Sequence, residues 1–168
     1  METQTPRGIR NNNPLNIRFS AKSDWLGKIK GEAKKDKEFE EFEEMKYGYR
    51  AAAYLIRQYK LSGTMTVEAI IKKWAPPSEN LTDKYINTVC QRSGLKRDTD
   101  IELYRAGDFL RLLDAMAFVE NGRVPQKLEL VKGYLMALGI YDSLDVEHVA
   151  ACLDYLECSG AIKINDSK

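Results

Sequence analysis

The sequence predicts an α+β domain in which helices predominate and a small β-hairpin region lies near the N-terminus. Two observations carry this prediction. From about residue 45 onward, apolar residues recur with the period of amphipathic helices, whereas the preceding segment is charged, punctuated by glycine and broken into short extended runs. With 168 residues, of which 43% are apolar and 30% charged, the chain is long and apolar enough to form one domain with its own core.

Residues 7–18, with the sequence R-G-I-R-N-N-N-P-L-N-I-R, predict a specified loop rather than a helix or a strand. Asn11, Asn12 and Asn13 stand in a row before Pro14. Asparagine tolerates left-handed dihedral angles and proline fixes φ, so the path of the backbone is strongly restricted here. A row of amides also supplies donors and acceptors that suit the hydroxyl and N-acetyl groups of sugars. An ordinary N-terminal turn would have a similar composition.

Residues 16–44 predict the hairpin region. Trp25 stands among charged residues, and Gly27 and Gly31 mark turns between short strands. Residues 34–44 are interpreted as a solvated edge strand that leads into the first long helix. The glutamates of this charge run, which are expected to face solvent, are Glu40, Glu41, Glu43 and Glu44.

Five helices follow, each with an apolar stripe at helical spacing. The stripes consist of Tyr49, Ala52, Ala53, Ile56 and Tyr59; of Val67, Ile70, Ile71 and Trp74; of Tyr85, Ile86 and Val89; of Phe109, Leu112, Leu113, Met116 and Ala117; and of Leu128, Val131, Leu135 and Leu138. Thr66 and Thr82 are the predicted N-caps of the second and third of these helices. Pro76 ends the second helix, and Gly94 and Gly122 suit the left-handed position that follows a helix.

The predicted domain covers residues 7–138. Residues 139–168 are a predicted C-terminal extension with a further helix from about residue 143 and no assigned role. Cys90, Cys152 and Cys158 lack metal-like spacing and are interpreted as packing residues in a reducing compartment. No metal or cofactor is predicted, because the one histidine cannot form a histidine-based metal site alone.

Composition also argues against several classes of partner. The formal net charge of +1 gives no basic footprint for nucleic acid. No apolar run approaches the length of a membrane span. The N-terminus lacks the pattern of a secretory signal, so we expect that another component delivers the protein to any substrate outside the cytoplasm.

Glu120 is the candidate catalytic residue. It follows Leu113, Met116 and Ala117 at helical spacing, so it lies at the end of the apolar stripe rather than on the solvated side of its helix. Burial among apolar groups raises the pKa of a carboxyl group, which is what a general acid needs near neutral pH. The alternative is that the helix frays at Asn121 and that Glu120 reaches water.

Three motifs together resemble a family found in phages and prophages, whose members are often described as virion structural proteins and are similar to lysozyme-like peptidoglycan-cleaving enzymes. The motifs are the loop of residues 7–18 with the following Trp25, the segment W-A-P-P-S-E-N-L-T-D-K-Y at residues 74–85, and E-N-G at residues 120–122. The resemblance covers about residues 7–137. Leu15 departs from it, because the family pattern more often has glycine there, and a glycine of positive φ would make the turn different in this chain.

A looser resemblance connects the chain to glucosaminidases and lytic transglycosylases of the lysozyme-like superfamily. In those enzymes a helix ending in Glu-Ser-Gly or similar precedes an Asn-rich turn and a tryptophan-glycine hairpin. Here the corresponding helix comes last, so the resemblance implies a circularly permuted lysozyme-like domain with Glu120 in the place of the catalytic glutamate. The termini of compact domains commonly lie close together, which makes such a permutation physically reasonable.

The resemblance implies cleavage of the β-1,4 bond between the amino sugars of peptidoglycan, by muramidase, glucosaminidase or lytic transglycosylase chemistry. Glu120 would protonate the leaving oxygen, and the N-acetyl group of the substrate would assist, because the sequence offers no certain second carboxylate. The implied substrate-binding residues are Asn12, Asn13, Asn16, Trp25, Ser78, Glu79, Asn80 and Tyr85. Tyr85 also fits a core role. The implied partners are peptidoglycan glycan strands and components of a phage or of a secretion machinery.

Two other classes of function are also compatible with the sequence. A phage-derived structural or cell-wall-binding module would keep a sugar groove without turnover. A generic helical interaction domain would lack a concave polar groove that unites the three motifs.

Overall fold

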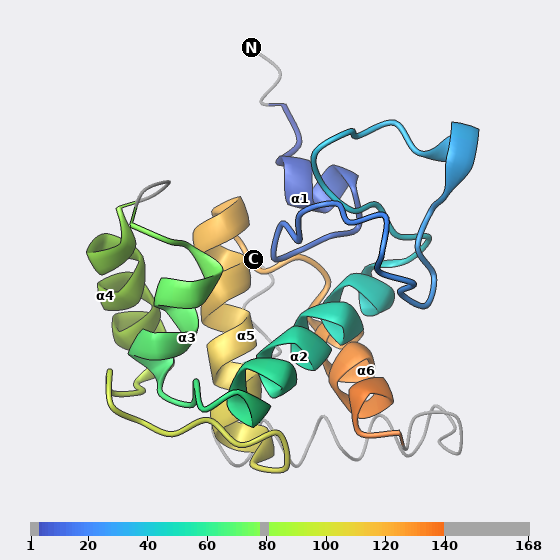
Figure 1. The fold of residues 1–168 in the computed structure, drawn as a ribbon. Helices are drawn as coiled ribbons and strands as arrows, with labels where there is room; N and C mark the ends of the chain where they lie inside the picture. The colour runs from blue at the N-terminus through green and yellow to red at the C-terminus, as the bar shows by residue number, and fades with distance from the viewer. Residues whose placement is uncertain (1–3, 78–80, 140–168) are drawn as a thin grey trace.

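The computed structural model describes residues 4–77 and 81–139, which form helices packed around one central helix (Figure 1). In chain order the elements are α1 (Arg7–Arg10), the 3-10 helix η1 (Gly31–Ala33), α2 (Met45–Leu61), α3 (Val67–Trp74), α4 (Thr82–Ser93), α5 (Ala106–Asn121) and α6 (Lys127–Ala137). The predicted predominance of helix is confirmed. The predicted helix from about residue 143, with the extension that carries it, lies outside the described residues. Within the described residues, no helix combines the length and the apolar character that crossing a membrane requires.

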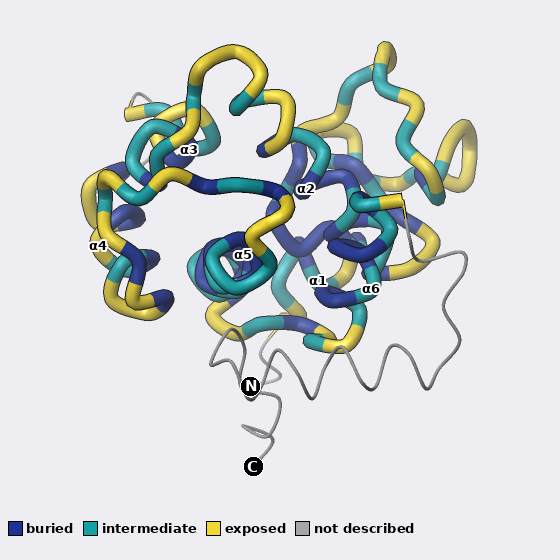
Figure 2. Tube along the Cα trace, turned by 90° about the horizontal axis from the view of Figure 1, so that it is seen from below, coloured by how far each residue is buried: buried dark blue, intermediate teal, exposed yellow. Residues whose placement is uncertain are grey.

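Helix α5 is the centre of the fold. Its buried residues form a wide apolar stripe that covers most of the helix, while the half-buried Arg111, Asp114 and Phe118 lie on the remaining side. The buried residues are Phe109, Leu110, Leu112, Leu113, Ala115, Met116, Ala117 and Asn121. Figure 2 shows α5 nearly end-on with other elements around it, and the helix contacts α1, α4 and α6. Gly122 has φ of 71° and occupies the left-handed position predicted for it after the helix.

Helices α2 and α6 pack against each other (Figure 1). Gly133 of α6 permits their close approach, because a Cβ atom there would lie 2.6 Å from both the Lys46 carbonyl oxygen and Tyr49 Cβ of α2. The Tyr49 hydroxyl donates a hydrogen bond of 2.6 Å to the Pro125 carbonyl, just before α6. The α2–α6 pair is therefore closely packed, and α6 also contacts the central helix.

Helices α3 and α4 form a second pair, of which α4 packs on α5. Thr66 caps α3 as predicted, since its Oγ1 accepts a hydrogen bond of 3.2 Å from the Ala69 amide. The predicted cap of α4 is wrong, because Leu81 occupies the N-cap position and Thr82 is the first helical residue. The Thr82 hydroxyl donates instead to the Ala75 carbonyl at 2.7 Å, which ties the start of α4 to the end of α3.

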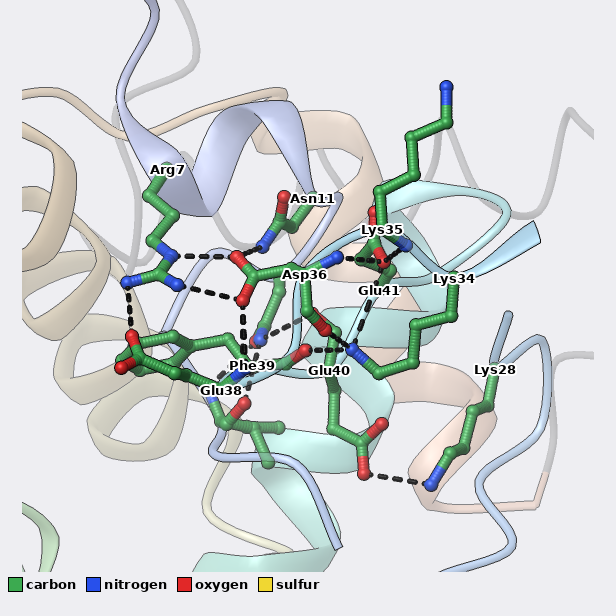
Figure 3. A network of polar contacts seen from close by, with 12 residues as sticks. Arg7, Asn11, Lys28, Lys34, Lys35, Asp36, Glu38, Phe39, Glu40 and Glu41 are labelled. Atoms are coloured by element: carbon green, nitrogen blue, oxygen red, sulfur yellow. Dashed lines mark hydrogen bonds and ion pairs between the residues drawn. The ribbon is translucent and has the colours of Figure 1, made fainter. Parts of the chain in front are cut away.

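The predicted hairpin region is largely irregular. Between the segment that precedes η1 and the segment that follows it, the described pairing consists of isolated antiparallel bridges, Arg18 with Phe39 and Lys28 with Phe42. Besides backbone hydrogen bonds such as that from the Ile29 amide to the Glu41 carbonyl at 2.8 Å, polar side chains connect the segments of this region (Figure 3). The order of the N-terminal region therefore depends on specific side-chain contacts.

Asp36 is the centre of one such network (Figure 3). Its carboxylate accepts hydrogen bonds of 2.6 and 2.7 Å from Arg7 and of 2.7 Å from Asn11 Nδ2. It also accepts bonds of 3.0 and 3.1 Å from the amides of Glu38 and Phe39. The Arg7 guanidinium is the main reason that the pKa of Asp36 lies well below its usual range. The network fastens α1 to the irregular segment that follows η1.

Glu40 corrects the interpretation of the glutamate run as a wholly solvated face. Its side chain is completely buried, and Lys28 Nζ donates to its Oε1 at 2.9 Å. The same ammonium group donates to the carbonyls of Ser20 and Ser23 at 2.7 and 3.0 Å. A buried carboxylate needs such a partner, because an unpaired charge in this position would be strongly destabilising. Glu43, by contrast, is exposed as predicted.

Candidate functional site

The Asn-rich loop begins with one helical turn, α1, and becomes irregular only after it, which corrects the prediction of a loop throughout residues 7–18. Asn12 and Asn16 each have φ of 50°, a left-handed conformation that asparagine adopts more readily than most residues. Leu15 does not have positive φ and is completely buried. The turn in this chain therefore places its left-handed residues on either side of Leu15 and needs no glycine there.

The amides of Asn12 and Asn13 hold the loop in place. Asn12 Nδ2 donates to the Phe42 carbonyl at 3.0 Å. Asn13 is completely buried, and its Nδ2 donates to the carbonyls of Ile17 and Glu40, each at 2.9 Å. Its Oδ1 accepts from the Ile17 amide at 2.9 Å. Both side chains are thus engaged with backbone groups, and sugar binding by them stays a prediction.

The Asn16 side chain, in contrast, contacts Glu120. Asn16 Nδ2 donates to Glu120 Oε2 at 2.8 Å, and the Tyr85 hydroxyl donates to Glu120 Oε1 at 3.0 Å. Glu120 is half-buried in the last turn of α5, and the helix continues through Asn121. One carboxyl group therefore joins the N-terminal loop, α4 and α5.

The environment of Glu120 favours its protonated form. Burial raises the pKa of this carboxyl group, and the hydrogen bonds from Asn16 and Tyr85 offset part of the rise. The pKa of Tyr85 itself is raised well above its ordinary value, first by burial and then by the Glu120 carboxylate. Its hydroxyl consequently remains a hydrogen-bond donor at every physiological pH.

Asn121 fastens the end of α5 to the loop, a role that the sequence pattern did not indicate. It is buried, and its Nδ2 donates to the carbonyls of Pro14 and Ala117 at 2.7 and 2.9 Å. On its other side lies Gly8, where a Cβ atom would be 2.4 Å from Asn121 Oδ1. A glycine at this position lets the helix end approach the loop, and the placement of Glu120 depends on that approach.

A groove of about 380 Å³ opens beside Glu120. We call it the Glu120 groove, and its polar and aromatic lining residues are Asn16, Arg18, Phe39, Tyr59, Lys73, Trp74 and Glu120. The lining combines the N-terminal loop, the end of α3 and the end of α5. The three motifs singled out in the sequence therefore meet at one concave surface.

Two aromatic side chains form one part of the groove lining. The rings of Tyr59 and Trp74 meet edge to face with their centroids 6.2 Å apart. Trp74 Nε1 donates to the Leu15 carbonyl at 3.2 Å, which connects α3 to the Asn-rich loop. In the sequence, both rings belong to the apolar stripes of their helices. Each ring lies in the last turn of its helix and carries a polar atom, the Tyr59 hydroxyl or the Trp74 indole N–H, that needs a hydrogen-bond partner. These two features could have indicated a place at the site.

The other predicted site residues lie at different distances from this groove. Tyr85 reaches Glu120 from α4, is buried, and also lines a second hollow of about 370 Å³ between α4 and α5. It therefore has the core role considered for it, and substrate binding by Tyr85 stays a prediction. Trp25 lines a separate hollow of about 380 Å³, so the structure does not bring it to the Glu120 groove. Ser78, Glu79 and Asn80 lie outside the described residues.

Glu120 is the one carboxylate among the described residues that line the groove. The basic residues of the same lining are Arg18 and Lys73. In the part of the chain that the structure describes, no three His, Cys, Asp or Glu side chains are grouped so as to hold a metal ion. A single carboxyl group in the described lining can accept or donate a proton.

Comparison with known proteins gives one informative similarity. No protein-family model matches the chain. The chain is similar to Protein P5 of Pseudoalteromonas phage PM2, with 37% identity over 134 residues. The matched region covers 77% of this chain and 79% of that protein. Identity of this level over most of both chains indicates a common ancestor.

Proposed function

The chain belongs to the family of Protein P5 of Pseudoalteromonas phage PM2, and for its Glu120 groove we propose cleavage of the glycan strands of peptidoglycan. The observation that carries this proposal is the half-buried Glu120 carboxyl group, which borders a groove with aromatic walls and accepts hydrogen bonds from two other elements. The bond broken is the β-1,4 linkage between amino sugars, and Glu120 acts as the general acid.

Glu120 donates its proton to the glycosidic oxygen as the bond to the sugar breaks. Because burial raises the pKa of Glu120, a larger fraction of this carboxyl group is protonated at a given pH than for an exposed glutamate. Asn16 and Tyr85 then stabilise the carboxylate that the proton leaves behind, because both donate hydrogen bonds to it. The same two donors fix the orientation of the carboxyl group before the reaction.

A group of the substrate itself stabilises the positive charge that develops on the sugar ring during cleavage. A two-carboxylate mechanism needs a second acidic group about 5 to 9 Å from the first. The described lining of the groove holds no carboxylate besides Glu120. The 2-N-acetyl group of the amino sugar acts in place of the second carboxylate. Either water or the 6-hydroxyl of the same sugar then completes the reaction. The proposal thus covers hydrolysis and formation of an anhydro sugar.

The aromatic walls of the groove support the choice of a glycan as substrate. Sugar rings present apolar C–H faces that pack on aromatic rings, while their hydroxyl groups need polar partners at the edges. Trp74 and Tyr59 offer the faces, and Asn16 offers an amide at the edge of the same groove. These side chains, rather than the predicted binding residue Trp25, offer the aromatic surface on which a sugar ring would pack.

A circularly permuted lysozyme-like arrangement is part of this proposal. Helix α1 contacts α5, so the Asn-rich loop near the N-terminus and the glutamate-bearing helix end are neighbours although 104 positions separate Asn16 from Glu120. Joining the old termini of a lysozyme-like domain and opening the chain after its glutamate helix would produce this order of elements.

A binding module without turnover is the second candidate. One observation favours it: both carboxylate oxygens of Glu120 already accept hydrogen bonds within the protein, as those of a purely structural glutamate do. Such a module would retain peptidoglycan in the groove and leave it intact, as a virion or cell-wall-binding component.

Loss of turbidity of purified peptidoglycan, measured with wild type and Glu120→Gln, tests the proposal. We expect wild type to clear the suspension and Glu120→Gln to be slower by about 100-fold or more, the usual contribution of a general acid. The exposed Glu43→Gln is the matched control and is expected to behave like wild type. Full activity of Glu120→Gln would remove Glu120 from the acid role, whereas binding without clearing by wild type would support the second candidate. Mass analysis of the released fragments distinguishes hydrolysis from anhydro-sugar formation.

A further inference from the structure

Two buried amide oxygens near Glu120 have no hydrogen-bond partner among the described residues. They are Asn16 Oδ1 and Asn121 Oδ1. The nitrogen atoms of the same two side chains are bonded: Asn16 Nδ2 donates to Glu120 Oε2, and Asn121 Nδ2 donates to the carbonyls of Pro14 and Ala117. A buried acceptor without a donor is costly, because it has lost its bonds to water. Two such oxygens at one site therefore indicate a polar arrangement that a second state of the site could complete.

The two unpaired oxygens lie on the same side of Gly8. The position that a Cβ atom of Gly8 would take is 2.4 Å from Asn121 Oδ1 and 3.0 Å from Asn16 Oδ1. Both oxygens thus converge on one small space. Two acceptors cannot bond to each other, whereas an amide N–H in the place of one oxygen could donate to the other.

A half-turn of the Asn16 amide about its Cβ–Cγ bond exchanges its oxygen and its nitrogen. Nδ2 then faces the space beside Gly8, where it can donate to Asn121 Oδ1, and Oδ1 faces Glu120. The same turn of Asn121 would be unfavourable, because its Nδ2 already holds two backbone carbonyls. Asn16 is therefore the member of the pair whose orientation can change.

The charge of Glu120 decides which orientation of the Asn16 amide is favourable. An ionised carboxylate only accepts hydrogen bonds, so it needs Nδ2, which is the arrangement in the structure. A protonated carboxyl group carries an O–H donor and can give it to Asn16 Oδ1. In that arrangement Asn16 Nδ2 donates to Asn121 Oδ1, and both oxygens that are unpaired beside the carboxylate have gained a donor.

We propose that the Asn16 amide turns over with the charge of Glu120, and that Asn121 Oδ1 is the acceptor that holds it in the orientation suited to the protonated acid. Asn121 is then a positioning residue that acts through Asn16. The turn itself occurs without a ligand, and its part in catalysis rests on the proposed function. A bound glycan would replace Asn16 Oδ1 with its glycosidic oxygen as the acceptor of the Glu120 proton. As that proton is transferred and the bonding electrons pass to the leaving oxygen, the amide turns and donates to the carboxylate that remains.

Glu120 is the group whose charge changes near neutral pH among the described ionisable groups around it. These groups are Tyr85 of α4, which bonds to it, and Tyr59 of α2, Lys73 of α3 and Arg18 of the loop, which line the same groove. The pKa values of both tyrosines are raised, chiefly by burial. Lysine and arginine stay charged through the range in which a glutamate titrates. A pH-dependent turn of the amide is therefore attributable to Glu120.

NMR spectroscopy of the free protein tests the inference. The carboxyl carbon shift of Glu120 reports its charge, and the Overhauser effect between the Asn16 Nδ2 protons and the Gly8 Hα protons reports the orientation of the amide. We expect this effect to be strong at low pH and to fade as pH rises, with the same midpoint as the carboxyl group. The amide carbon shift of Asn121 should follow that midpoint, because its oxygen gains or loses a donor.

Asn13 is the internal control for this titration. Its Nδ2 donates to the carbonyls of Ile17 and Glu40, and its Oδ1 accepts from the Ile17 amide. Because both ends of the Asn13 amide are bonded to the backbone, its Overhauser contacts should stay constant over the same range of pH.

Two variants should hold the Asn16 amide in one orientation each. Glu120→Gln places a permanent donor beside Asn16, so the contact with Gly8 should persist at every pH. Asn121→Leu removes the acceptor at similar volume, so this contact should be lost and the titration of Glu120 should move to lower pH. If Asn121→Leu does not fold, the titration of the Asn121 amide carbon in wild type decides its role.

An Asn16–Gly8 contact that is absent at every pH in wild type, or present at every pH, would overturn the inference. A midpoint that differs from that of the Glu120 carboxyl group would do the same, and an Asn121 amide carbon that does not titrate would remove Asn121 from its role. Failure of the proposed function has a different signature, in which the amide turns with pH but wild type does not cleave peptidoglycan. Cleavage by a protein whose amide never turns would refute the inference alone.

Discussion

The Tyr85 hydroxyl donates a hydrogen bond of 3.0 Å to Glu120 Oε1, and this contact joins α4 to the end of α5 at the groove. Tyr85 is buried, and its hydroxyl lies where it lowers the pKa of a carboxyl group that burial otherwise raises. Removal of this one oxygen atom is therefore the least disruptive way to change the acidity of Glu120.

Replacement of Tyr85 by phenylalanine should shift the pH dependence of peptidoglycan cleavage. Without the donor, the pKa of Glu120 rises, because the hydrogen bond favours the charged form. The acid works when protonated, so the decline of activity on the alkaline side should move to higher pH. We also expect the maximal rate to fall by about tenfold, since the carboxyl group loses a positioning contact.

The pH–rate profile of Tyr85→Phe, measured beside that of Tyr104→Phe, checks this prediction. Tyr104 is 79% exposed, so its variant should keep the wild-type profile. An alkaline limb that stays in place, or moves to lower pH, would contradict the electrostatic role given to Tyr85.

Substitution of Asn16 should separate backbone strain from loss of the amide. Asn16→Gly and Asn16→Ala both remove the donor to Glu120, so both should lower activity. Glycine accepts φ of 50° without strain, whereas alanine is expected to lower the free energy of unfolding by about 1 kcal/mol relative to glycine. Denaturant unfolding measures the difference. Asn12 has the same φ, so the same pair of substitutions there should show a similar gap, and equal stability of the two Asn16 variants would argue against a left-handed residue at this point.

Asp36 should make stability depend on acidity. Its pKa is lower in the folded protein than in the unfolded chain, chiefly through the Arg7 guanidinium. The contribution to stability is therefore present above the unfolded pKa of about 4 and is lost as pH falls through the lower, folded value. Asp36→Asn should be less stable than wild type at neutral pH by about 2 kcal/mol and should lose less stability on acidification.

Thermal unfolding at several pH values below neutrality measures this effect. Asp24→Asn is the control, because Asp24 pairs with Lys30 on the exposed surface. The hydrogen bond from Lys30 is the main reason that the pKa of Asp24 is lowered. Such exposed pairs contribute little to stability. Identical acid dependence of wild type and Asp36→Asn would refute the role assigned to the network of Figure 3.

The buried pair of Lys28 and Glu40 should behave as a unit. Lys28→Met leaves the completely buried Glu40 carboxylate without its cation and should lower the free energy of unfolding by about 3 to 5 kcal/mol. Replacement of both residues by methionine should restore part of that loss, because no unpaired charge is left. A double-mutant cycle with denaturant unfolding measures the coupling, and additive losses would show that the two charges do not depend on each other.

The helices could be predicted because their information is local. The stripe that includes Val67 and Ile70, the Thr66 cap and the left-handed Gly94 each depend on residues within one or two turns of the chain. The N-terminal region could not be predicted in the same way. Its order comes from pairs such as Lys28 with Glu40, which leave no periodic trace in the sequence and make a buried glutamate look like part of a solvated run.

The candidate site was predictable in part for the same reason. Glu120 could be found because it interrupts the apolar stripe of α5. Trp74 and Tyr59 could not be assigned to the groove, since an aromatic residue at the end of a stripe looks alike in sequence whether its ring contacts the core or a ligand. Their role depends on where α3 ends relative to the Asn-rich loop, which is a property of the folded chain.

The span of sequence between Asn16 and Glu120 has a consequence for biosynthesis. A nascent chain that has emerged from the ribosome only as far as α4 already contains the loop but has no acid to place against it. The groove becomes complete only when α5 docks, so a polypeptide truncated before that helix lacks Glu120 and, under the proposed function, would not cleave a glycan strand.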